Sequence, residues 1–410
     1  MFRNFYGEFV KEHHTMPLWN PYLYGGMPFI DAMHGDTFFP LAALQFILPI
    51  QRALGYKLVI MVFFGGVFMY MFLLRFNFSP TLAMFGGLAY MLSGFLVSLV
   101  YAGHDGRMYI TALLPLILMA TISILRNKSL KSLLFFAFSF SILILANHPQ
   151  FAYFAMWCVG AYFIYGVVRQ FLDKKNINTL LKPSIIIITA IILGLAGSIV
   201  QLLPPYIYVN NYSPRAEESR GYDYAASWSM HQEEALSLIL PGFVGTSVGD
   251  DDNYWGKNAF RLHSDYPGII VTVLALLAVF YYRRKREIYF FTGVAIFALL
   301  YALGDHTPVF KLFYYVVPGV KSFRAPSTIM FLYIFSLVFI AVHGLKLLID
   351  PELSARRYKK YLYFLSACAG ILAFIALLFT VAAESIFKLW ASIFYSSIPD
   401  VKSMSFETMG

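Results

Sequence analysis

Long apolar runs recur along most of the chain, separated by short charged segments or by proline and glycine. About twenty consecutive apolar residues allow a helix to cross a bilayer. Runs near that length predict about ten membrane-spanning helices, so the expected fold class is an all-α polytopic membrane protein. The predicted spans are residues 58–74, 81–101, 108–125, 132–148, 151–168, 184–203, 266–282, 288–303, 328–348 and 361–383.

Two long polar segments interrupt this pattern. Residues 1–55 contain "PLWNPYLYGG", whose prolines and glycines disfavour a helix and whose aromatic side chains suit a membrane interface. Residues 38–48 are apolar but too short to cross a bilayer, so they predict an interfacial or re-entrant helix. The expected organisation is a first outer loop with this helix (1–55), spans (56–203), a long outer loop (204–265), spans (266–383) and an outer tail (384–410).

The composition fits a membrane protein. The chain is 59% hydrophobic and only 13% charged, whereas soluble proteins average about 25% charged residues. The net charge of +9 therefore indicates cytoplasmic loops and lipid headgroups, and no nucleic-acid partner is expected. Cys158 and Cys368 both lie inside apolar runs, which argues against a disulfide framework.

Lysine and arginine collect in alternate loops, and this predicts the orientation. The loops are residues 126–131, 169–182, 283–286 and 346–360. Because cytoplasmic loops carry an excess of these residues, the intervening segments 1–55, 102–107, 147–150, 204–265 and 304–326 are predicted to lie outside. The start of the chain lacks the apolar segment of a signal peptide. We therefore expect a further transmembrane helix upstream of residue 1.

The first candidate site on the predicted outer side is "DAMHGDTFFP", which holds Asp31, His34 and Asp36. A carboxylate beside an imidazole at a bilayer surface is a candidate general base or metal ligand. The structural alternative is a turn in which Asp36 caps the short helix that follows.

A second cluster, "AGHDGRMY", places His104, Asp105 and Arg107 in a short turn between two predicted spans. Flanking glycines suit a tight turn, but a turn does not need three ionisable side chains. Such groups at the edge of a membrane are candidates for function. The alternative is a surface ion pair, worth less than about 1 kcal/mol.

Other polar residues lie on the same predicted side. "NHPQ" places His148 and Gln150 at the end of a span, where the proline ends the helix, and a buried terminal histidine is the structural alternative. Arg215 and Arg324 could bind phosphate oxygens or extend toward lipid headgroups. The acidic turn 250–252 could hold a divalent cation or be solvated.

Several signatures are missing from the sequence. It contains no phosphate-binding G-x-x-x-x-G-K-[ST], no G-x-G-x-x-G, no H-E-x-x-H and no paired C-x-x-C. No nucleotide cofactor or zinc site is therefore predicted. An enzyme acting on the outer face would need an activated donor carried by a lipid.

An ordered set of motifs resembles the YfhO family of bacterial membrane proteins over residues 1 to about 344. These motifs are "PLWNPYLYGGMPF", "AGHDGRMY", "NHPQ", "YSPRA", "YWG" and "LGDHTPVFKLFYYVVPGVKSFRAPS". The resemblance implies a GT-C glycosyltransferase architecture in the bacterial cytoplasmic membrane. It also implies sugar transfer from a polyprenyl-phosphate donor to an envelope glycopolymer such as lipoteichoic acid.

The resemblance has consequences for both ends of the chain. In the family, the tryptophan–asparagine–proline stretch follows a first transmembrane helix, and an acidic residue early in that outer loop is the usual candidate base. This leaves open whether the main catalytic carboxylate lies upstream of residue 1. Family members also extend further at the C-terminus.

The expected function is therefore a membrane glycosyltransferase with its active face outward and with membrane lipid around it. Alternatives are a flippase for lipid-linked sugars and a non-catalytic partner in envelope assembly. No cofactor is expected, with a divalent cation left open. We expect the outer segments to close over one cavity, with Asp36 facing Asp105. The assigned roles are acid or base for Asp36 and Asp105, orientation for His104 and His148, phosphate binding for Arg107, Arg215 and Arg324, and substrate binding for Trp19, Tyr22 and Gln150.

Overall fold

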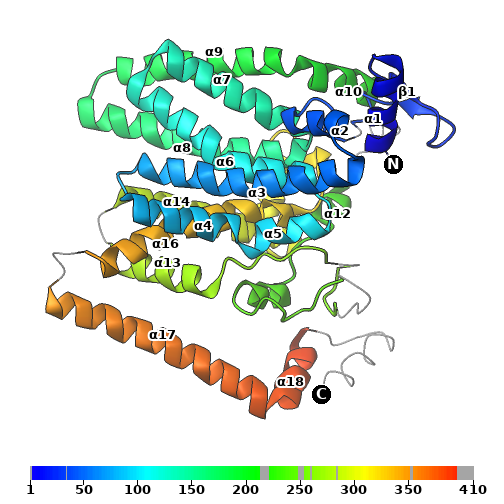
Figure 1. Cartoon of the computed structure of the whole chain (residues 1–410). Coiled ribbons are helices and arrows are strands. Elements are labelled where there is room, and N and C mark those ends of the chain that lie inside the picture. Colours follow the sequence, from blue (N-terminus) through cyan, green and yellow to red (C-terminus); the bar gives the residue numbers. More distant parts are fainter. Residues whose placement is uncertain are drawn as a thin grey trace. The chain divides into compact units, whose positions relative to one another are not determined.

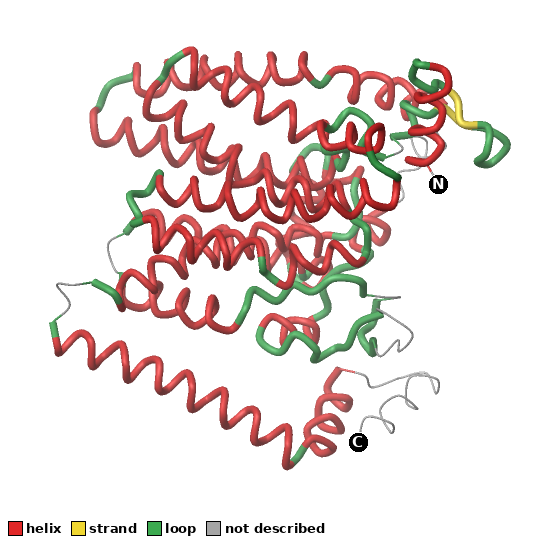
Figure 2. Tube along the Cα trace, viewed as in Figure 1, coloured by secondary structure: helices red, strands yellow, loops and turns green. Residues whose placement is uncertain are grey.

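The chain is almost entirely helical (Figures 1 and 2). A computed structural model describes residues 2–33, 35–212, 221–247, 254–258, 261–282, 285–350 and 354–394. The described residues form one two-stranded antiparallel sheet, in which β1 (Trp19–Asn20) pairs with β2 (Met27–Pro28). The chain divides into two compact units, which are described separately below.

Seven helical segments among the described residues are long and apolar enough to cross a membrane. This confirms a helical multi-pass membrane protein. The segments are α3 (Ile50–Leu74), Pro80–Tyr101 with α4 (Pro80–Met91) and α5 (Gly94–Tyr101), α6 (Asp105–Asn127), α8 (Pro149–Lys174), α9 (Asn178–Gly197), Pro326–Leu348 with η5 (Pro326–Ile329) and α16 (Met330–Leu348), and α17 (Ala355–Val381).

Three of the predicted spans are shorter helices. They are α7 (Leu130–Leu145), α13 (Ile269–Tyr281) and α14 (Arg286–Ala302). The sequence breaks explain two of them. Pro149 disfavours a helix at His148, so α7 ends before that corner, and Gly268 has a φ of +101° directly before α13. The apolar runs alone do not reveal these helix ends.

The first unit comprises residues 1–92, 99–225 and 314–324. Helix α6 forms its core, because every residue from Met108 to Leu125 is buried. It packs against α3, α7 and α8, while α4 packs on α3 and α9 packs on α7 (Figure 1). Helices α6 and α8 run in the same direction. His148 contacts Arg107 near their starts, and Gln170 donates a 2.9 Å hydrogen bond to the Leu125 carbonyl near their ends.

The start of this unit differs from the prediction. Residues 2–13 form a helix, α1 (Phe2–His13), that the sequence pattern did not indicate. The predicted interfacial helix is broken into η1 (Pro40–Ala43) and α2 (Leu44–Ile47). Helix α3 begins at Ile50, directly after Pro49, so the first predicted span starts eight residues earlier than expected and includes Lys57.

The remaining described elements of the first unit include α10 (Ile199–Tyr212) and η4 (Val320–Ser322). The predicted outer loop from residue 204 therefore starts too early, since the helix continues through Pro204 and Pro205. The division passes through the sequences of α12 (Gly221–Ala226) and α15 (Pro308–Val316), each of which has residues in both units.

In the second unit, α16 packs against both α13 and α14. Its other short elements are η2 (Gln232–Leu238) and η3 (Gly304–His306). Helix α17 exposes nearly all of its apolar surface, with Tyr361 as its buried residue. The predicted tail after residue 384 begins as a helix instead, α18 (Ala383–Phe394).

Candidate active site

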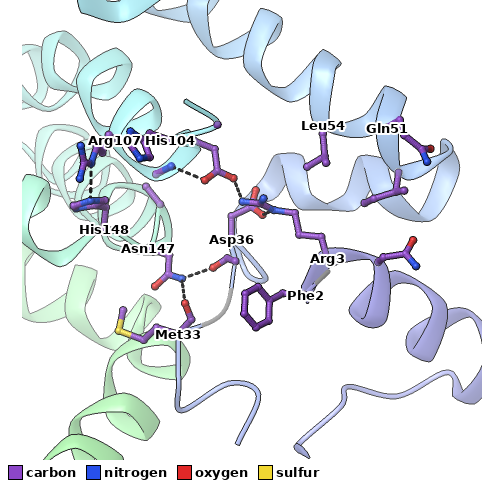
Figure 3. A pocket seen from close by; sticks show the side chains of 17 residues that line it. Phe2, Arg3, Met33, Asp36, Gln51, Leu54, His104, Arg107, Asn147 and His148 are labelled. Carbon is purple, nitrogen blue, oxygen red and sulfur yellow. Dashed lines mark hydrogen bonds and ion pairs between the residues drawn. The ribbon is translucent and has the colours of Figure 1, made fainter. Parts of the chain in front are cut away.

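One cavity in the first unit gathers five of the predicted site residues (Figure 3). It has a volume of about 660 Å³. Its polar lining comes from the start of α1, the loop before η1, Gln51 of α3, the turn before α6 with the first residues of that helix, and the corner between α7 and α8. The predicted residues that line it are Asp36, His104, Asp105, Arg107 and His148.

Asp36 is held by three donors and is almost fully buried. Its Oδ1 atom accepts a 2.9 Å hydrogen bond from Arg3 Nε, and its Oδ2 atom accepts bonds from Lys57 Nζ at 2.6 Å and Tyr109 Oη at 3.0 Å. Its side chain is 3% exposed. Burial by itself would raise the pKa of Asp36, but the charges of Lys57 and Arg3 hold it below its ordinary value. Asp36 is therefore a weak base, and its carboxylate holds Arg3 in place.

Asp105 occupies a more open position. Its side chain is 18% exposed and belongs to the first turn of α6. One carboxylate oxygen accepts a 2.9 Å bond from the Gly106 amide, and the other accepts a bond from Arg3 Nη2. The amides at the start of a helix stabilise a negative charge there. Of the two aspartates, Asp105 is the carboxylate that a ligand in the cavity can reach.

Arg3 connects the two carboxylates. Its Nε atom bonds to Asp36 and its Nη2 atom bonds to Asp105 (Figure 3). The planar guanidinium can hold two partners at fixed angles, which the single ammonium group of lysine cannot do. The predicted proximity of Asp36 and Asp105 is thus produced by one residue of α1.

On the other wall of the cavity, His148 contacts Arg107. The Arg107 Nε atom donates a 3.3 Å hydrogen bond to Nε2 of His148, and the Arg107 guanidinium lies 5.7 Å from the ring centre of Phe151. Burial, with the charge of Arg107 and the nearby His104, lowers the pKa of His148 to about 3. The imidazole is therefore neutral at physiological pH.

The loop that carries Asp36 is fixed to the corner before α8. Asn147 Nδ2 donates hydrogen bonds to the carbonyls of Met33, at 3.0 Å, and Gly35, while its Oδ1 atom accepts a 3.0 Å bond from Gln201. Gly35 has a φ of +74°, a conformation that favours glycine. These contacts fix the Asp36 loop against the corner that carries His148.

Other predicted residues do not line this cavity. Trp19 and Tyr22 lie in or next to the β1–β2 hairpin and are 54% and 73% exposed. The structure therefore does not place their aromatic rings beside the carboxylates. Gln150 instead donates a hydrogen bond to the carbonyl of Arg324, whose guanidinium lies 5.6 Å from the ring centre of Tyr224. His34, Arg215 and the acidic turn 250–252 lie outside the described residues.

Sequence reasoning missed Arg3, Lys57 and Tyr109. Arg3 is 33 and 102 positions away from its two partners, so local spacing carries no signal for it. The predicted span 58–74 begins one residue after Lys57. A helix that begins directly after Pro49 places Lys57 two turns inside α3, where an ionisable residue needs a partner. That proline is the signal that could have revealed it.

Within the described part of the chain, no group of three or more His, Cys, Asp or Glu side chains could hold a metal ion. The cavity combines carboxylates with guanidinium groups instead. The guanidinium groups suit an anionic ligand, and a carboxylate beside them can accept a proton.

Comparison of the chain with protein-family models, curated proteins and solved structures finds no match. The sequence pattern and the helices together show a helical membrane protein with several candidate spans.

Proposed function

We propose that this protein is a GT-C-type membrane glycosyltransferase, as its resemblance to the YfhO family implies. It would transfer a sugar from a polyprenyl-phosphate donor to an envelope glycopolymer on the outer face of the bacterial cytoplasmic membrane. One observation carries the proposal: a partly exposed carboxylate, Asp105, shares a cavity with the cationic side chains of Arg3 and Arg107. A transferase that uses this donor needs both kinds of group.

The two aspartates would have different roles. Asp105 would act as the general base, because it is the more exposed of the two carboxylates that line the cavity. Asp36 would position Arg3, since its lowered pKa and three donors leave it little basicity. A donor phosphate would compete with Asp105 for Arg3 and so free the base as the substrate binds.

In the proposed reaction, Asp105 takes the proton of an acceptor hydroxyl. The hydroxyl oxygen forms a bond to the anomeric carbon of the donor sugar, while the bond between that carbon and the phosphate oxygen breaks. The polyprenyl phosphate leaves with the bonding electron pair. Arg3 and Arg107 would stabilise its negative charge, which a preorganised cation does without moving.

The test is the Asp105→Asn variant, expressed as the sole copy in cells whose envelope glycopolymer carries the added sugar. We expect the sugar content to fall to that of cells lacking the protein, with unchanged amounts of protein in the membrane. Asp173→Asn is the matched control, because Asp173 is an exposed carboxylate near the other end of α8. Wild-type sugar content in the Asp105→Asn cells would disprove the assignment of the base.

A flippase for lipid-linked sugars is the second candidate, and the buried Lys57–Asp36 pair favours it. Transporters place ionisable residues inside their spans, and Lys57 lies inside α3 with only 1% of its side chain exposed. Reconstituted liposomes separate the two functions. Movement of a labelled polyprenyl-phosphate sugar across the bilayer, without any transfer product, would favour transport.

A further inference from the structure

We propose that His148 is a positioning residue for anion binding: its neutral ring accepts a hydrogen bond from Arg107 Nε and presents the terminal amino groups of that guanidinium to the phosphate of the donor. This inference rests on the proposed function for the identity of the ligand. In this role His148 contacts the neighbouring side chain of Arg107 and not the substrate.

The first step concerns the protonation of the ring. An arginine is charged at all physiological pH values and can only donate. The 3.3 Å contact from Arg107 Nε therefore requires a lone pair on Nε2 of His148, which an imidazolium lacks (Figure 3). Burial and the same guanidinium keep the pKa of His148 near 3, in agreement with a neutral ring.

The second step fixes the tautomer. A neutral imidazole has one lone pair and one N–H group. The Phe151 amide also points at the ring, 3.4 Å from Nδ1, so both contacts cannot be accepted at once. The charged donor forms the stronger bond, which places the proton on Nδ1.

The third step concerns what Arg107 leaves available. Its Nε atom is engaged by His148, and its guanidinium carbon lies 5.7 Å from the ring centre of Phe151. Arg107 forms no ion pair with any carboxylate among the described residues, although it lines the cavity. When the Nε atom of a guanidinium is already bonded, its two terminal amino groups remain available. Together they fit two oxygens of a phosphate.

The surroundings also favour an anion at this point. The guanidinium of Arg324, in the same unit, lies near enough to repel that of Arg107. A nearby like charge disfavours a charged group, and an anion between the two would offset this. A phosphate would relieve this repulsion, and His148 could not do so, because it carries no charge.

The experiment measures binding of farnesyl phosphate, a short polyprenyl phosphate, to the purified full chain in detergent micelles by calorimetry. The wild type should bind. His148→Phe keeps an aromatic ring but removes the acceptor, so it should weaken binding about tenfold, as expected for loss of support from a charge-assisted bond. His148→Gln supplies an acceptor oxygen and should bind within about threefold of the wild type.

A double-mutant cycle with Arg107→Ala separates positioning from direct contact. If His148 acts through Arg107, the His148→Phe/Arg107→Ala protein binds no more weakly than Arg107→Ala alone. Additive losses, or unchanged binding by His148→Phe, would overturn the inference. Thermal unfolding curves for each variant distinguish lost binding from lost structure.

The binding experiment can fail or succeed independently of the test of the proposed function. Binding that follows the predicted order of variants, without any sugar transfer by the wild type, would support the anion site and reject the glycosyltransferase. No binding of farnesyl phosphate by a folded wild type would reject the phosphate ligand and this inference with it. Transfer that persists in the His148→Phe protein with unchanged apparent affinity would reject the positioning role alone.

Discussion

Lys57 donates a 2.6 Å hydrogen bond to Asp36, and both side chains are almost completely buried, at 1% and 3% exposure. Removing one member of such a pair leaves a buried charge without compensation, at a cost of about 3–5 kcal/mol. We therefore expect Lys57→Met and Asp36→Asn each to lower the stability of the protein strongly. Thermal unfolding in detergent, followed by tryptophan fluorescence, measures the change.

The matched control is the exposed pair Glu384 and Lys388 on α18. Lys388→Met should leave the unfolding temperature unchanged, because an exposed pair contributes little. The double variant Asp36→Asn/Lys57→Met should lose less than the two single changes added together. Strict additivity would show that the two residues do not stabilise the fold as a pair.

Substitution of Arg3 tests the bridge between the two aspartates. Arg3→Lys keeps the charge but cannot hold both carboxylates at once, so we expect sugar transfer to fall about tenfold or more. Arg52→Lys is the control, since Arg52 is an exposed arginine on α3 and does not line the cavity. Equal transfer by the two variants would mean that the bridge has no role in the reaction.

The protonation state of His148 predicts a dependence of stability on pH. Its folded pKa of about 3 lies below the ordinary value of 6.5, so below pH 6.5 the unfolded chain gains a proton that the folded site does not accept. Stability should therefore decrease from pH 6.5 toward pH 3, and this group should have no effect above pH 6.5. The expected loss at pH 5 is up to about 2 kcal/mol.

His148→Gln cannot titrate and should remove this part of the pH dependence. Unfolding temperatures of both proteins at pH 7.5 and pH 5 provide the comparison. Parallel losses in the two proteins would contradict a depressed pKa for His148.

Gly106 tests how closely the two turns of the site approach each other. A methyl group there would lie 2.9 Å from the Ala146 carbonyl oxygen and 3.2 Å from Cβ of His148. Gly106→Ala should therefore push the corner away, lower stability by about 1–3 kcal/mol and reduce transfer. In Gly160→Ala, the added methyl meets nothing within 4 Å and lies inside α8, so this control should be neutral or slightly stabilising.

The sequence carried much of the membrane architecture and less of the site. The apolar runs predicted helices at every proposed span, because the cost of burying polar backbone in lipid leaves a clear pattern. Span lengths near Gly268 and His148 were wrong, because those ends depend on local backbone geometry. The predicted start of α3 was wrong because the continuous apolar run begins at residue 58, whereas the helix begins directly after Pro49.

Within the site, the sequence indicates Asp36 by the imidazole next to it in the first outer loop, and Asp105 and His148 by their place at the ends of predicted spans. Their roles were not separable from sequence. Exposure distinguishes the two aspartates, and exposure depends on Arg3 and Lys57, which reach the site through folding rather than through spacing. The contact between His148 and Arg107 likewise joins two helices that are not neighbours in sequence.

The position of Lys57 also constrains the order in which the protein is built. Helix α3 carries this cation two turns from its start, and a charge at that depth is costly until a counter-ion arrives. The counter-ion, Asp36, belongs to the segment that is synthesised just before the helix. During biogenesis, α3 would remain shallow at the interface, with its lysine in water, until the preceding loop folds over it. Full insertion of the helix and formation of the site would thus occur together. A chain with a misfolded loop would also have an incompletely inserted helix, which the cell's quality-control proteases could recognise.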